Sequence, residues 1–309
     1  MSLRTLIWTA LVQLTTPAIS VIIPTFNRPR ELANCLAAFE RSNYPADQFE
    51  IIVVDDGSVV SPESTLALIN KRLDVKLVRQ ANAGPSAARN AGARRASGHI
   101  LAFTDDDCAP AADWLQQIAL RFIAEPDCII VGGRTLNSLS DNIFSAVSQH
   151  IVDVGCAHHN KDPNDARFFT ANNLAVRTAD FFRVGGFDRS FGNTASEDRE
   201  LCGRWLHHGY RMIYVPEATM YHAHRLTFRT FCRQHFNYGR GALLLQKIRR
   251  QQGWQLFKPD PRYYARLLRS SLYAGPIARV VSVVALLVTA QAAAALGMAT
   301  QWINQELRG

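Results

Sequence analysis

The sequence predicts an α/β fold in which a doubly wound, mostly parallel sheet is flanked by helices, and three observations support this. Short runs rich in Ile and Val recur through the first half, and they are apolar throughout, as is typical of strands buried on both faces. Segments with helical spacing lie between them, which gives the alternation of strand and helix that parallel sheets require. The 309 residues are 48% hydrophobic and 19% charged, the composition of a folded chain.

Five segments are expected to form buried parallel strands: 19–24, 50–54, 75–79, 99–103 and 128–133. After the first of these, Pro29 favours a helix start, and the apolar residues Leu32, Cys35, Leu36 and Phe39 then recur with helical spacing. The pair Gly84-Pro85 introduces a second helix, and residues 200–209 are expected to form a third.

Polar clusters follow four of these strands, at the point where each strand ends. They are PTFNR (24–28), DDGS (55–58), QANAGPSAARN (80–90) and TDDDC (104–108). The carboxyl ends of parallel strands meet at one edge of a sheet, where ligands bind. A single cluster such as DDGS can be only a turn. Four clusters at successive strand ends indicate a shared binding site.

The residue types at this edge suggest a metal-bound diphosphate. The phosphate-binding patterns GxGxxG and GxxxxGK[ST] are absent. Adjacent carboxylates repel one another, but Asp105 and Asp107 can share one divalent cation. Mg²⁺ binds in this way, through one or two carboxylates and the phosphates of a ligand, and Mn²⁺ accepts the same oxygen ligands.

These motifs, in this order, resemble those of the family 2 glycosyltransferases with the GT-A fold. SVIIPTFNR, IIVVDDGS, NAGPSAARNAG and ILAFTDDDC carry the resemblance, ASEDRELCGRW resembles the family's acidic segment before a helix, and the likeness covers roughly residues 18–225. It implies an inverting transferase of class EC 2.4. The donor would be a UDP-, GDP- or dTDP-sugar, the cofactor Mg²⁺ or Mn²⁺, and the acceptor a hydroxyl of a cell-envelope glycan or a lipid-linked sugar.

The resemblance also implies roles for individual residues. Asp107 would bind the metal, Asp105 would lie toward both ribose and metal, and Asp106 between them would point away. Asp198 would be the general base, with Glu197 as second candidate, although both acids could simply cap the following helix. Asp55 would accept a hydrogen bond from the base, with Asp56 as second candidate. The remaining predicted ligands of the nucleotide sugar are Pro24, Thr25, Asn27, Arg28, Arg89, Asn90, Asn172 and Asn173, and a histidine, His222 or His224, would approach the metal.

For Asn172 and Asn173, a role in a structural turn explains the sequence almost as well as binding of the sugar does.

The basic residues are concentrated in the C-terminal third. Residues 225–269 contain eleven Arg or Lys and one acid, a net charge of +10, on a pattern typical of a basic amphipathic helix. Such a helix is typical of proteins that bind an anionic membrane surface, although clustered arginines can also bind nucleic acid. Residues 280–303 contain no charge and are long enough to span a bilayer, which favours the membrane over nucleic acid.

The predicted organisation is therefore an apolar N-terminal segment (1–17), a catalytic domain (18–224), a basic helical region (225–279) and an apolar membrane-associated or transmembrane segment (280–309). Arginines precede the last segment, so the positive-inside rule places the catalytic domain at the cytoplasmic face of the cell membrane, peripheral or with a single span. The six cysteines lack CxxC pairs, which agrees with a reducing compartment.

Two alternatives compete with this interpretation. An Asp-x-Asp sequence after an apolar strand also occurs in haloacid-dehalogenase-like phosphotransferases, but the later acidic motif of that class is missing. A non-catalytic sugar-nucleotide or lipid-binding protein is the second alternative, and the acids at 105, 107 and 198 argue against it.

Overall fold

The computed structural model describes residues 16–307 except 68, 70–72, 128–129, 193, 257 and 273–274. The predicted apolar segment 1–17 therefore lies outside the described residues apart from its last two. The described strands are β1 (Ile19–Thr25), β2 (Phe49–Asp55), β3 (Val75–Arg79), β4 (Ile100–Phe103), β5 (Cys108–Pro110), β6 (Ile130–Asn137), β7 (Leu174–Arg177) and β8 (Met212–His222).

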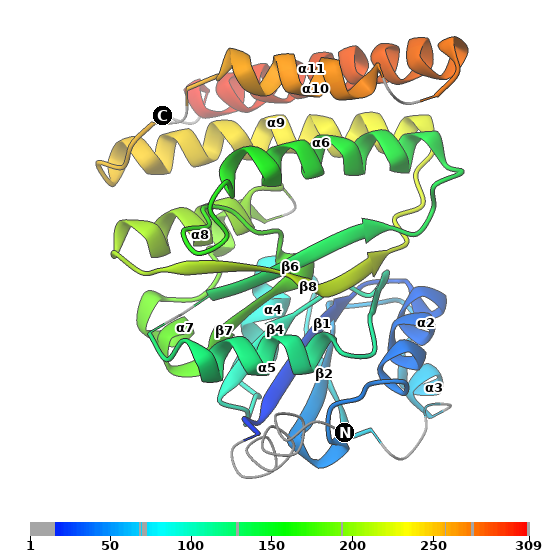
Figure 1. Ribbon diagram of the computed structural model, residues 1–309, viewed down its shortest axis with the longest axis vertical. Helices are drawn as coiled ribbons and strands as arrows, with labels where there is room; N and C mark the ends of the chain where they lie inside the picture. Colours follow the sequence, from blue (N-terminus) through cyan, green and yellow to red (C-terminus); the bar gives the residue numbers. More distant parts are fainter. Residues whose placement is uncertain are drawn as a thin grey trace, which may run out of the picture.

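The described helices alternate with these strands and then continue alone at the C-terminal end (Figure 1). They are α2 (Pro29–Phe39), α3 (Glu63–Leu66), α4 (Pro85–Ala93), α5 (Trp114–Ala124), α6 (Ile143–His159), α7 (Thr178–Val184), α8 (Glu197–His207), α9 (Phe228–Gln251), α10 (Pro261–Ser271) and α11 (Ile277–Glu306), with 3-10 turns at Ala46–Gln48, Ala171–Asn173 and Arg189–Phe191.

The strands form one mixed sheet in the order β3-β2-β1-β4-β7-β6-β8-β5. Strands β1 to β4 are parallel to one another, as expected, and β7 and β5 run antiparallel to their neighbours. The predicted strand 128–133 corresponds to β6, which pairs in parallel only with β8 and antiparallel with β7. The predicted strand 75–79 is β3, an edge strand of the sheet that is only partly buried.

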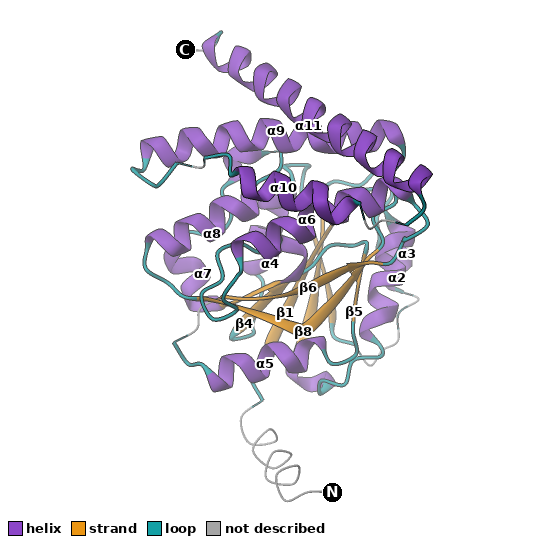
Figure 2. Cartoon of the chain, turned by 45° about the horizontal axis from the view of Figure 1, so that its top comes forward, coloured by secondary structure: helices purple, strands orange, loops and turns teal. Residues whose placement is uncertain are grey.

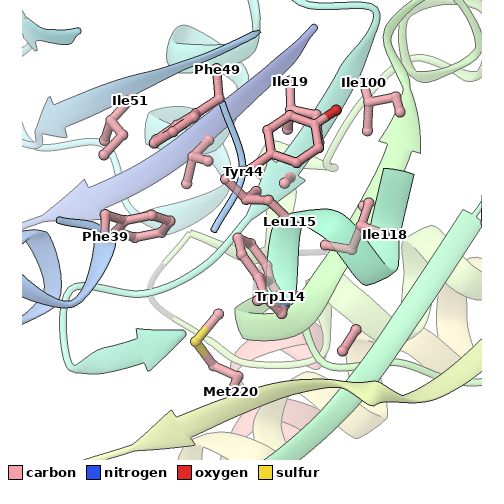
Figure 3. Close-up of a cluster of buried hydrophobic side chains, with 14 of the residues drawn as sticks. Ile19, Phe39, Tyr44, Phe49, Ile51, Ile100, Trp114, Leu115, Ile118 and Met220 are labelled. Atoms are coloured by element: carbon pink, nitrogen blue, oxygen red, sulfur yellow. The ribbon is translucent and has the colours of Figure 1, made fainter. Parts of the chain in front are cut away.

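Two hydrophobic clusters cover the two faces of the sheet. Val21 and Ile23 of β1 point into one cluster with residues of α2 and α5, while Ile22 points into the other with residues of α4, α7 and α8. Phe39 and Trp114 meet edge to face in the first cluster, with ring centroids 6.0 Å apart (Figure 3). This double packing fixes the strand ends that carry the polar clusters.

Helix α6 and the three C-terminal helices form two further layers above the sheet (Figures 1 and 2). The first layer contains α6 and α9, and the second contains α10 and α11. A third hydrophobic cluster joins them, including Val147 of α6, Phe231 of α9, Leu267 of α10 and Leu287 of α11. Helices α9 and α11 touch backbone to backbone: a Cβ on Gly239 would lie 1.9 Å from the Ala294 carbonyl oxygen. Within the described residues, α11 is the one helix long and apolar enough to cross a membrane.

Candidate active site

A cavity of about 840 Å³ lies where the four strand ends meet, and it continues between α6 and α9. Its size falls within the usual range for sites that enclose small ligands. Among the predicted site residues, those that line it are Pro24, Thr25, Arg28, Asp56, Arg89, Asp105, Asp107, Asn172, Glu197, Asp198, His222 and His224. Residues from both halves of the chain therefore face one space.

Asp107 lies at the centre of a cluster of cationic partners. Its Oδ1 is 3.2 Å from Nε2 of His222, and its Oδ2 accepts a hydrogen bond from Nη1 of Arg28 at 2.9 Å. Burial works against ionisation, but the hydrogen bond and charge of His222, together with the charge of Arg28, hold the pKa of the Asp107 carboxyl well below its usual range. The carboxylate is thus ionised and surrounded by positive charge.

Asp106 does not point away, contrary to the expectation from the sequence. It is buried, its Oδ2 accepts from the Thr25 hydroxyl at 2.8 Å, and its Oδ1 accepts from the same Arg28 nitrogen that binds Asp107. Burial raises the pKa of this carboxyl to about 7. Its role in the structure is to hold the end of β1 and Arg28 beside Asp107.

Arg89 connects the acid motif with the acidic start of α8. Its Nη2 donates to Asp105 at 2.8 Å, and its Nη1 donates to Glu197 at 2.9 Å. The guanidinium lies over the Phe187 ring, 5.4 Å from its centroid. Because Arg89 is itself buried, these two ion pairs fix the position of Glu197 relative to Asp105.

Among the described residues, Asp198 is the acid of α8 without an ion-pair partner, whereas Glu197 pairs with Arg89 and Glu200 with Arg204. The residue before the helix, Ser196, has a left-handed backbone (φ 84°), and the Asp198 carboxylate accepts from the backbone N–H of Arg199. Burial, and next the charge of Glu197, raise the pKa of Asp198 to about 6. At neutral pH it is therefore ionised but ready to accept a proton.

The loop that carries these acids is held by α9. A Cβ on Gly241 would lie 1.8 Å from the Ala195 carbonyl oxygen, so only glycine allows the two backbones to approach this closely. The C-terminal helices are thus in direct contact with the start of α8.

The residues around Asp107 fit a divalent cation. Ligand atoms of Asp107, His222 and Cys108 lie within 4.8 Å of one another. Burial raises the pKa of the Cys108 thiol well above its ordinary value, so it stays protonated and is a poor ligand. Carboxylate oxygens with one imidazole nitrogen remain, a donor set that suits Mn²⁺ or a similar ion. Asp105 lies beside this group at the cavity, paired with Arg89.

Four of the predicted ligand-binding residues are used inside the protein and do not line the cavity. Asp55 accepts from Nε of Arg79 and from the N–H of Ser58, and the Asn27 side chain accepts from the N–H of Val59. Asn90 binds both backbone polar groups of Phe187. The fourth, Asn173, accepts from the Trp114 indole N–H and donates to the Arg134 and Ala218 carbonyls.

Asp56, the second candidate for base binding, does reach the cavity edge. Its carboxylate accepts from the backbone N–H groups of Ala83 and Gly84 and from Gln80, and so it holds the loop that precedes α4.

Sequence reasoning missed the part of the cavity between α6 and α9. Here the lining residues include Ser148, Gln149, Gln234, Asn237 and Tyr238. A signal was present, because Gln234, Asn237 and Tyr238 recur at helical spacing as an uncharged polar stripe within the basic helix.

The fold is α/β, its strand ends present paired acids to a cavity, and a further acid at a helix start lines the same cavity. This is the architecture of a GT-A domain. The chain belongs to glycosyl transferase family 2, because the sequence model of that family matches residues 20–188. This membership excludes the dehalogenase-like alternative.

Known relatives agree with this assignment. A validoxylamine A glucosyltransferase of Streptomyces hygroscopicus subsp. jinggangensis (strain 5008) is 30% identical over 229 residues, which is 65% of this chain and 54% of that protein. A chondroitin synthase of Pasteurella multocida (strain Pm70) is 30% identical over 241 residues, 66% of this chain and 24% of that protein. The chain thus spans about half or less of the length of these curated relatives.

Among solved structures, a mannosyltransferase from Pyrobaculum calidifontis in complex with GDP-Man and Mn²⁺ superposes with a TM-score of 0.67 at 19% identity, covering 96% of this chain and 94% of that chain. At this level of identity the likeness establishes the fold, and it extends over nearly the whole chain.

Proposed function

We propose that the protein is a metal-dependent, inverting glycosyltransferase that moves a sugar from a nucleotide-diphosphate donor to an acceptor hydroxyl. One observation carries the proposal: the acid cluster at Asp105 and Asp107 and the separate carboxylate of Asp198 line the same cavity. Acids at both ends suit a reaction in which a diphosphate leaves on one side while a hydroxyl attacks from the other. The structural relative solved with GDP-Man and Mn²⁺ supports a sugar nucleotide and a divalent cation.

In this mechanism, Asp107, Asp105 and His222 would hold the cation, which neutralises charge on the leaving diphosphate when bound. Asp198 accepts the proton of the acceptor hydroxyl, and the oxygen forms a bond to the anomeric carbon. The bond from that carbon to the diphosphate oxygen breaks, and its electron pair leaves with the nucleoside diphosphate. Attack from the far side inverts the anomeric configuration.

The structure favours Asp198 over Glu197 as the base. Glu197 is held by Arg89 at 2.9 Å, so protonating it would break an ion pair. Asp198 has no such partner in the described part of the chain, and its pKa of about 6 suits a base that works near neutral pH. Glu197 instead fixes the helix start and Arg89.

We further propose that the protein binds the cytoplasmic face of a membrane with α11 lying in the plane of the bilayer surface, where it would meet glycan or lipid-linked acceptors. Its outer face is apolar and exposed: Ile277 is 84% exposed, Val281 62%, Val288 64% and Leu296 64%. Its inner face packs on α9, which carries many arginines, so a spanning orientation would have to break that contact or draw α9 into the lipid.

Under this proposal, the predicted regions 225–279 and 280–309 serve as the membrane-facing part of the catalytic unit.

Release of nucleoside diphosphate from UDP-, GDP- and dTDP-sugars tests the transferase proposal. Wild-type protein should release it with Mn²⁺ or Mg²⁺ and stop in EDTA. Asp107→Asn should abolish the release, and Asp47→Asn, which changes an exposed acid outside the cavity lining, serves as the matched control. Release that is unaffected by EDTA in the wild type would contradict the proposal, and a protein that binds sugar nucleotides without turnover would favour the non-catalytic alternative.

A further inference from the structure

The cavity has a second arm, between α6 and α9, that a nucleotide sugar bound at the strand ends would leave open. Its lining is made mostly of hydroxyl and amide groups, with apolar side chains between them. The residues concerned are Ser145, Ser148, Gln149, Ile151 and Val152 from α6, and Gln234, Asn237 and Tyr238 from α9. The arm adjoins Asp198, which lines the same space.

The hydrogen bonds inside this arm leave one polar group unmatched. The Gln234 amide donates to the Ser148 hydroxyl at 3.0 Å and to the Tyr238 hydroxyl at 2.6 Å. Its carbonyl oxygen Oε1 is buried and has no hydrogen-bond partner among the residues that the structure describes. A buried polar atom without a partner is costly, which points to a ligand group that supplies the missing bond.

A hydroxyl group is the partner that satisfies this site in either orientation of the amide. If the amide is turned over, Oε1 accepts from Ser148 and Tyr238, and the NH₂ group is then the unmatched end. A ligand hydroxyl both donates and accepts, so it pairs with either end of Gln234. A phosphate, which only accepts, would suit one orientation of the amide alone.

Tyr238, which is hydrogen-bonded to this amide, lines the same cavity as the proposed base. Its hydroxyl accepts from Gln234, which leaves its own proton free to donate. Burial, with a contribution from the nearby charge of Asp198, raises the pKa of Tyr238 to about 12, so the phenol stays protonated. A hydroxyl held by Tyr238 and Gln234 would therefore be close to Asp198.

Positive charge gathers at an adjoining cavity that shares Gln234 and Tyr238 with the arm. Arg28, Arg225 and Arg233 line this cavity. Cations there suit a leaving diphosphate, whereas the residues of α6 that line the arm are all uncharged. The two ends of the site thus differ in the chemistry they can recognise.

We propose that the arm between α6 and α9 binds the acceptor, that this acceptor presents an uncharged, hydroxyl-rich glycosyl residue to Asp198, and that Gln234 and Tyr238 position the attacking hydroxyl. The inference rests on the proposed function and adds the class of acceptor.

The test measures transfer from the active sugar nucleotide to a panel of neutral nitrophenyl glycosides and to the matching uronates and sugar phosphates. Neutral glycosides should be preferred. Gln234→Leu and Tyr238→Phe should raise the KM for the glycoside about tenfold, the loss of about one hydrogen bond, while the KM for the donor stays the same. Tyr264→Phe, on α10 and outside the cavity, is the matched control and should change neither KM.

Three results would overturn the inference: preference for anionic acceptors, absence of transfer to any neutral glycoside, or an unchanged glycoside KM in both variants. Thermal unfolding of each variant shows whether it is folded, and the Tyr238→Phe change removes only one oxygen. Metal-dependent hydrolysis of the donor by wild-type protein without acceptor tests the proposed function separately, so the two failures can be told apart.

Discussion

Replacing Asp198 by Asn should inactivate the protein and stabilise it at the same time. The structure gives the reason: burial and the charge of Glu197 raise the pKa of this carboxyl from 3.8 to about 6. The folded protein therefore disfavours the ionised form. Asn has the same shape, can still accept from the Arg199 N–H, and carries no charge.

The size of the effect follows from linkage. Moving a carboxyl pKa from 3.8 to about 6 makes the ionised form about 3 kcal/mol less favourable in the folded protein than in the unfolded chain. Because the folded state binds the proton more tightly, this cost is absent below about pH 4, grows between pH 4 and 6, and is complete above that. Asp198→Asn should thus raise the free energy of unfolding by about 1 to 3 kcal/mol at pH 8. The gain should shrink toward pH 4.

The assay combines urea unfolding at pH 8 and pH 5 with kcat at saturating substrates, where a fall of about 100-fold or more is expected. If Asp198 served only as a helix cap, the substitution would lower the free energy of unfolding, because losing a first-turn carboxylate costs about 0.3–1 kcal/mol. Glu31→Gln, in the first turn of α2 and away from the cavity, shows the size of that ordinary effect. A destabilised Asp198→Asn that keeps its kcat would refute the assignment of the base.

Three further predictions concern pH, metal and membrane. Because the base must be ionised, kcat should fall below about pH 6 and stay level above it, and a kcat that is flat from pH 5 to 8 would argue against Asp198. By calorimetry, Asp107→Asn should weaken Mn²⁺ binding more than about tenfold, while Asp47→Asn leaves it unchanged; equal affinities would remove Asp107 from the metal site. Full-length protein should sediment with anionic vesicles and be only partly released by high salt, because burial of apolar surface is not screened. Val281→Glu with Val288→Glu should release it, whereas Ser282→Glu, on the flank of the same helix, should not; vesicle binding that survives the double change would exclude this face.

The part of the cavity at the strand ends was largely predictable from the sequence. Parallel strands place their carboxyl ends together, so polar residues after β1, β2, β3 and β4 had to meet, and they do meet at one cavity. The sequence alone could not distinguish polar side chains that face the cavity from polar side chains that form hydrogen bonds within the fold. Asn90 and Phe187 are 97 positions apart, and only the folded chain shows that the asparagine amide is used up by that backbone.

The part of the cavity between α6 and α9, and the antiparallel part of the sheet, were less predictable, for a related reason. Short strands such as β5 and β7 have too few residues to show a period, so the antiparallel part of the sheet was not anticipated. The arginines of α9 drew attention to its charge, while the polar stripe that faces the cavity became meaningful only once α6 was placed opposite it. The predicted boundary at residue 224 also separates helices that share one hydrophobic cluster.

The stereochemistry of donor hydrolysis tests the central claim most directly, because it needs no known acceptor. Wild-type protein, Mn²⁺ and the accepted sugar nucleotide are followed by proton NMR in the first minutes, before the released sugar equilibrates. Metal-dependent inverting chemistry with Asp198 as base predicts that the anomer opposite to that of the donor appears first, that EDTA prevents its formation, and that Asp198→Asn slows it about 100-fold. Release of the anomer with the donor's own configuration, or release at the same rate in EDTA, would contradict the account.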